Sequence, residues 1–172
     1  PDWINNDYVT VNDQNQIGLS FTIDPESEIR ILNVERKTGS SGSFEWIAEL
    51  PSSPDPQRYT DTRADIGKIN VYRAYVRNSC GVPVKYSNTG SNLVLSALLS
   101  DGGLILKWNP YRKWEGDIST YRIFTDTGQG WEIEAEPYAG DSTYLIKDIA
   151  GLMYRAAGNE ICFLIRAYET MN

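Results

Sequence analysis

Apolar and polar side chains alternate along short runs of this chain, and that alternation limits its fold more than any other feature. The clearest run spans residues 16–24, where apolar residues occupy every second position: Ile17, Leu19, Phe21 and Ile23. A period of two places such residues on one face of a β-strand. Clusters of Gly, Pro, Asn, Asp and Ser separate the runs, as they do between strands. The pattern therefore predicts an all-β chain of the sandwich or barrel kind.

Further strands are predicted at residues 29–37, 44–50, 69–78 and 83–87. On the first of these, we expect the face that carries Leu32 and Val34 to be buried, because the opposite face turns polar. No segment of useful length has a helical period. Residues 148–158 come nearest, and their bracketing glycines limit them to a turn or two.

The second half of the chain repeats the pattern of the first at an interval of about ninety residues, which indicates a domain duplication because solenoid repeats are shorter. The corresponding pairs are Phe21 and Trp108, Leu32 and Tyr121, Val34 and Ile123, Tyr59 and Tyr144, Tyr72 and Phe163, and Ala74 and Ile165. We expect these twelve residues to form two separate cores. The predicted modules are residues 1–90 and 91–172, divided within the polar segment 87–92.

Composition argues against several classes of function. A formal net charge of −7 disfavours binding to nucleic acids and to anionic membranes. The chain has no histidine, so it lacks the commonest general base and the commonest metal ligand, and two cysteines do not build a structural zinc site. It contains neither a phosphate-binding glycine loop nor a nucleophile elbow, and no apolar run reaches the ~18 residues of a membrane span. We therefore predict a non-enzymatic protein without cofactor, metal or membrane insertion.

The order of the motifs resembles that of fibronectin type III modules. Such modules place an aromatic residue on the second strand, a Tyr-x-Val-x-Arg pattern on the third and a Tyr-x-Val-x-Ala pattern on the sixth. Phe21 and Trp108 match the aromatic position of the second strand. Residues 32–36 and 121–123 resemble the third-strand pattern, and residues 72–78 and 163–167 resemble the sixth-strand pattern. Between the third and sixth strands, Tyr59-Thr60-Asp61 and residues 144–148 resemble a further motif of these modules. The resemblance covers nearly the whole chain and implies two tandem immunoglobulin-like β-sandwiches.

A narrower resemblance involves residues 106–116, 78–81 and 161–169. These segments are similar to modules of large secreted Bacteroidota proteins that end in gliding-motility-associated C-terminal domains. The resemblance implies a secreted or cell-surface protein outside the outer membrane, which acts as a structural or interaction spacer in adhesion, type IX secretion or gliding motility.

The second module is expected to lack its last strand, because the residues from Leu93 onward are fewer than the ~100 typical of such a sandwich. Either the sequence is a piece of a longer protein, which is the simpler interpretation, or a protein partner supplies the strand to an open edge. In the resembled modules a cysteine at the position of Cys162 pairs with one on the missing strand. Cys162 and Cys80 are therefore predicted to be free thiols, since a disulfide between them would have to cross the modules.

Three tryptophans are candidates for ligand contact: Trp46, Trp114 and Trp131. Exposed aromatic faces suit the stacking of sugar rings, so a carbohydrate-binding accessory module is the alternative function. The competing interpretation is that these residues cover a core or a loop. For Trp46 the outcome depends on Ile47, because Trp46 is exposed if Ile47 faces the core.

Overall fold

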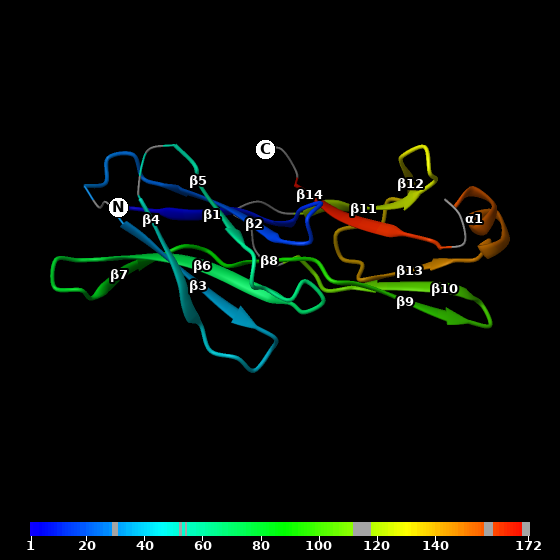
Figure 1. Cartoon of the computed structure of the whole chain (residues 1–172), viewed down its shortest axis with the longest axis horizontal. Coiled ribbons are helices and arrows are strands. Elements are labelled where there is room, and N and C mark those ends of the chain that lie inside the picture. Colours follow the sequence, from blue (N-terminus) through cyan, green and yellow to red (C-terminus); the bar gives the residue numbers. More distant parts are fainter. Residues whose placement is uncertain (29–30, 52, 54, 112–117, 157–159, 170–172) are drawn as a thin grey trace. The chain divides into compact units, whose positions relative to one another are not determined.

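The computed structural model describes residues 1–28, 31–51, 53, 55–111, 118–156 and 160–169. The chain divides into two compact units (Figure 1). Unit 1 consists of Pro1–Asn92 with Tyr111–Glu115, and unit 2 consists of Leu93–Pro110 with Gly116–Asn172.

Unit 1 is built from two antiparallel sheets. The first has the order β1-β2-β5, formed by β1 (Ile4–Val11), β2 (Ile17–Ile23) and β5 (Gln57–Asp61). The second has the order β4-β3-β6-β7, formed by β4 (Glu45–Pro51), β3 (Ile31–Thr38), β6 (Asn70–Arg77) and β7 (Pro83–Tyr86). The two-residue strand β8 (Gly90–Ser91) pairs with β6 as well.

The core of unit 1 comes from the inward residues of both sheets. Phe21 on β2, Leu32 and Val34 on β3, and Tyr72 and Ala74 on β6 are all buried in one apolar cluster. Each strand contributes every second residue to this cluster, as the pleat of a strand requires. Tyr59 packs against the same cluster but is only partly buried.

A buried polar network joins the two sheets of unit 1. Asp61, at the end of β5, is 1% exposed and accepts a hydrogen bond from the guanidinium of Arg36 on β3 at 2.8 Å. The hydroxyl of Tyr72 on β6 donates to the same carboxylate oxygen at 3.1 Å, and the backbone amide of Arg63 donates to the other oxygen at 3.0 Å. Asp61 therefore bonds residues from both layers of the sandwich.

This network makes the stability of unit 1 sensitive to alkaline pH. Burial, followed by the neighbouring charge of Asp61, raises the pKa of Tyr72 well above its ordinary value. In the unfolded chain Tyr72 loses its proton near pH 10, whereas the folded chain retains it. The stabilisation is therefore complete below about pH 10 and falls as the pH rises above that value, by up to ~1.4 kcal/mol per pH unit.

We expect Tyr72→Phe to remove this alkaline loss of stability. Urea unfolding of unit 1, followed between neutral and strongly alkaline pH, should show a shallower decline for the variant than for the parent chain. Tyr86→Phe is the matched control, because Tyr86 lies exposed on the outer face of the same sheet. Equal slopes for Tyr72→Phe and the parent would contradict the assignment.

Unit 2 is also built from two antiparallel sheets. One has the order β13-β10-β9, formed by β13 (Thr143–Ile146), β10 (Gly103–Trp108) and β9 (Leu95–Ser100). The other has the order β12-β11-β14, formed by β12 (Trp131–Ala135), β11 (Ile118–Asp126) and β14 (Phe163–Glu169). The short helix α1 (Ile149–Arg155) begins after Asp148, whose carboxylate accepts a hydrogen bond from the backbone amide of Gly151.

Trp108 connects the two sheets of unit 2. Its ring on β10 meets the ring of Tyr121 on β11 edge to face, with 5.5 Å between the ring centres. Ile123 on the same strand and Ile165 on the neighbouring strand β14 are also buried, whereas Tyr144 and Phe163 are partly buried. Strand β14 pairs with β11, and in the described part of the chain no strand pairs with its other edge.

The predicted fold class is confirmed, because both units consist of antiparallel β-sheets and the one helix among the described residues has seven residues. The polar segment 87–92, in which the sequence places the boundary between the modules, is hydrogen-bonded to unit 1. The backbone amide of Asn6 donates to the side-chain oxygen of Asn88 at 2.6 Å, and the Asn88 amide donates to the Asn6 carbonyl at 3.1 Å. Asn92 is buried and its side-chain oxygen accepts a hydrogen bond from the Asn70 backbone amide at 2.8 Å.

A candidate binding hollow on the outer sheet of unit 1

The outer face of the β4-β3-β6-β7 sheet is defined by the residues that point away from the core. On β3 these are Ile31, Asn33 and Glu35, because Leu32 and Val34 point inward. On β4 the simple alternation breaks. The pairing of β3 with β4 shifts register between Val34 and Glu35, so that Glu49 pairs with Asn33 while Trp46 pairs with Glu35. A β-bulge of this kind places one extra residue in a strand and re-aims its neighbours.

The bulge explains how Trp46 and Glu49 both come to the outer face, although they are three positions apart. Ala48 is buried in the core and Ile47 packs against it, which leaves Trp46 55% exposed. The sequence predicts that Trp46 is exposed if Ile47 faces the core. In the structure Ile47 packs against the core and Trp46 is exposed. Strict alternation would have placed Glu49 on the opposite face from Trp46.

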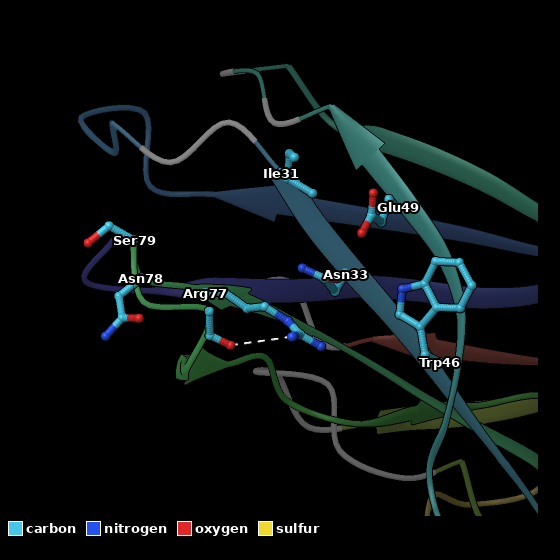
Figure 2. A pocket seen from close by; sticks show the side chains of 8 residues that line it. Ile31, Asn33, Trp46, Glu49, Arg77, Asn78 and Ser79 are labelled. Atoms are coloured by element: carbon cyan, nitrogen blue, oxygen red, sulfur yellow. Dashed lines mark hydrogen bonds between the residues drawn. The ribbon is translucent and has the colours of Figure 1, made fainter.

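A hollow of about 560 Å³ lies over these residues (Figure 2). This volume falls within the ~300–1,000 Å³ of typical small-molecule sites. Its lining comes from β3, β4, the end of β6 and the following turn: Ile31, Asn33, Trp46, Glu49, Arg77, Asn78, Ser79 and Gly81. Figure 2 shows Asn33 between the Trp46 ring on one side and Arg77 with the 78–81 turn on the other.

Asn33 is the most deeply buried polar residue of the hollow. Only 4% of it is exposed, and its side-chain amide forms no hydrogen bond with another described residue. Its amide opens into the solvent of the hollow, unlike the fully enclosed and unpartnered Oδ1 of Asn6. The Asn33 amide has two N–H donors and one oxygen acceptor, which can hydrogen-bond to a ligand in the hollow.

Arg77 is held in place on the opposite side of the hollow. Its guanidinium donates to the Tyr75 hydroxyl at 2.7 Å and to the Gly81 carbonyl at 3.3 Å. The hydrogen bond to Tyr75 raises the pKa of Arg77 further, so the side chain stays cationic. Glu49 brings a carboxylate to the same hollow, and the two formal charges offset each other.

The turn at the end of β6 is fixed by a side chain. Asn78 accepts hydrogen bonds through its side-chain oxygen from the backbone amides of Cys80 and Val82, both at 3.0 Å. Gly81 adopts a φ of 78°, a left-handed conformation that glycine tolerates best. The rim of the hollow formed by Ser79 and Gly81 is therefore well defined by local bonds.

Next to the hollow, arginine and aromatic side chains stack across the same face. The Arg73 guanidinium lies 4.0 Å from the centre of the Phe44 ring and 4.4 Å from that of Tyr86, and it also bonds Glu35 at 2.8 Å. Tyr86 in turn lies 5.4 Å from Tyr75, which holds Arg77. This stack supports the side of the hollow formed by β6.

None of the other residues predicted as sites lines the hollow within the described part of the chain. Trp131 is 48% exposed on β12 of unit 2, and Trp114 lies outside the described residues. Cys80 is an exposed free thiol in the turn beside the hollow, and Cys162 is an exposed free thiol just before β14. Sequence reasoning did not single out Asn33, Glu49 or Arg77, because a register shift and a turn bring them together rather than a motif.

In the ranges that the structure describes, no group of three or more His, Cys, Asp or Glu residues is placed to hold a metal ion. Nor does any helix in those ranges have the length and apolar character needed to cross a bilayer.

Comparison with known proteins gives structural likenesses alone. No family model and no curated protein matches the chain. The chain is similar to a two-domain fibronectin type III segment of chicken tenascin, with 14% identity, a TM-score of 0.35, and coverage of 96% of this chain and 92% of that one. It is also similar to the FN1–FN3 domains of chicken CNTN1, with 12% identity, a TM-score of 0.33, and coverage of 96% and 63% respectively.

Proposed function

We propose that this chain is a non-catalytic structural and interaction segment of a secreted or cell-surface protein. The observation that carries the proposal is its construction from two compact β-units, each with its own buried residues between antiparallel sheets. Such units hold their shape without cofactors and present faces, edges and loops to partners. The proposed modules are residues 1–90 and 91–172, as the sequence repeat predicts.

The narrower roles in adhesion, type IX secretion or gliding motility are supported by the Bacteroidota-like segments at 106–116 and 78–81. The edge of β14 supports a protein partner in particular. Strand β14 is seven residues long and pairs with β11 on one side, while its other edge meets no strand among the described residues. Exposed edges of this length accept an added strand through backbone hydrogen bonds.

Surface labelling tests the proposed location. An antibody raised against the folded chain should label intact cells of the organism that carries the gene, and protease added outside those cells should remove the signal. Labelling that requires permeabilised cells would contradict the proposal. A cytoplasmic protein of known abundance, probed in the same samples, controls for cell integrity.

A further inference from the structure

We propose that the hollow on the outer sheet of unit 1 binds a neutral saccharide, which stacks on Trp46 and bonds to the amide of Asn33. This binding site goes beyond the structural role proposed above and does not depend on it. Three features of the hollow carry the proposal: an exposed aromatic ring, a largely buried asparagine whose amide opens into the hollow, and opposite charges that offset each other.

The aromatic ring supplies the apolar part of the site. One face of a pyranose ring presents mainly C–H groups, which pack against the flat face of an indole. Trp46 is 55% exposed, and the bulge in β4 fixes it on the outer face opposite Glu35. Tryptophan combines a large apolar surface with a polar N–H, which suits a ligand that is apolar on one face and polar at its rim.

The floor of the hollow supplies directional hydrogen bonds. Asn33 is 4% exposed, and its amide opens into the hollow that it lines. A ligand hydroxyl both donates and accepts, as the amide does, so the two groups match. A purely apolar ligand would leave the amide unsatisfied, which carries an energetic cost.

The charges select against strongly ionic ligands. Glu49 and Arg77 line the same hollow, so its formal charge sums to zero. An anion would face Glu49, and a cation would face Arg77. A neutral polyol instead donates to the carboxylate and accepts from the guanidinium, and charged groups form the stronger hydrogen bonds.

The site is also largely organised before binding. Arg77 is held by Tyr75 and Gly81, and the turn that carries Ser79 is fixed by Asn78. Side chains that are already ordered lose little conformational entropy when a ligand binds. Because the hollow lies on the face of the sheet, a stacked ring fits it better than an added β-strand, which needs a free edge.

An NMR titration of the whole chain tests the proposal with defined probes: cellohexaose, xylohexaose, mannohexaose and maltoheptaose. At least one of these should shift the Trp46 indole N–H and the Asn33 side-chain amide resonances in a saturable manner. Hexagalacturonate, an anionic oligosaccharide, should shift them less.

Variants assign the binding to the hollow. Trp46→Ala and Asn33→Ala should each weaken the affinity at least about tenfold, whereas Trp131→Ala should leave it unchanged. The Trp131 variant is the matched control, because it removes an equally exposed tryptophan from unit 2. Amide spectra of each variant establish that unit 1 remains folded.

Three outcomes would overturn the proposal. They are the absence of shifts at the hollow with every neutral probe at millimolar concentration, tighter binding of hexagalacturonate than of the neutral probes, and binding lost in Trp131→Ala but not in Trp46→Ala. The surface-labelling experiment is independent of these results, so the structural role and the saccharide site can fail separately.

Discussion

Replacing Asp61 by alanine should lower the free energy of unfolding of unit 1 by about 3–5 kcal/mol. The carboxylate is 1% exposed, and the variant would leave the Arg36 guanidinium and the Tyr72 hydroxyl without their shared acceptor. Removing one partner from a buried network costs the desolvation of the groups that remain. Asp61→Ala also removes the hydrogen bonds that join β5 of one sheet to β3 and β6 of the other.

Chemical denaturation, monitored through the amide hydrogen exchange of unit 1, measures this loss of stability. Asp13→Ala is the matched control, because Asp13 is an exposed aspartate in the loop between β1 and β2. That control should change the stability by less than about 0.5 kcal/mol. Asp61→Asn should lie between the two, because it retains a hydrogen-bond acceptor and loses the charge. An Asp61→Ala chain that is as stable as the parent would show that the network contributes nothing to folding.

The sequence indicated those elements whose apolar residues follow a period of two. Strand β2 is the clearest example, because Ile17, Leu19, Phe21 and Ile23 are all buried. Strand β1 was not predicted. Its register shifts between Asn6 and Tyr8, and a buried asparagine takes the place of an apolar residue at Asn6. A bulge and a buried polar residue both remove the alternation on which such a prediction depends.

The candidate site was only partly accessible from the sequence. Trp46 could be singled out as an exposed aromatic residue, since its phase relative to Ile47 is visible in the chain. Asn33 and Arg77 could not, because they lie 44 positions apart by their numbers and meet only through the pairing of β3 with β6. The same holds for Asp61, whose partners lie on two strands of the opposite sheet. Constellations that depend on tertiary contact leave no local signal.

Replacing Trp108 by alanine is the corresponding test of unit 2, and it should lower the free energy of unfolding by about 3–5 kcal/mol. Trp108 is 5% exposed and packs edge to face on Tyr121 from the other sheet. The deletion removes a large apolar surface and leaves a cavity that the surrounding strands fill only in part. It does not remove a hydrogen bond within the described residues, because the buried indole N–H has no partner there. The expected loss is therefore one of packing, and Trp108→Phe should recover much of it.

Hydrogen exchange resolved by residue separates the two units in this experiment. Protection should fall in β10, β11 and β13 of the Trp108→Ala chain, while β2, β3 and β6 of unit 1 should keep the protection of the parent, because each unit has its own buried residues. Trp131→Ala controls for the loss of an exposed tryptophan from the same unit. Equal loss of protection in both units would mean that they unfold together, and an unchanged unit 2 would mean that Trp108 does not hold its sheets together.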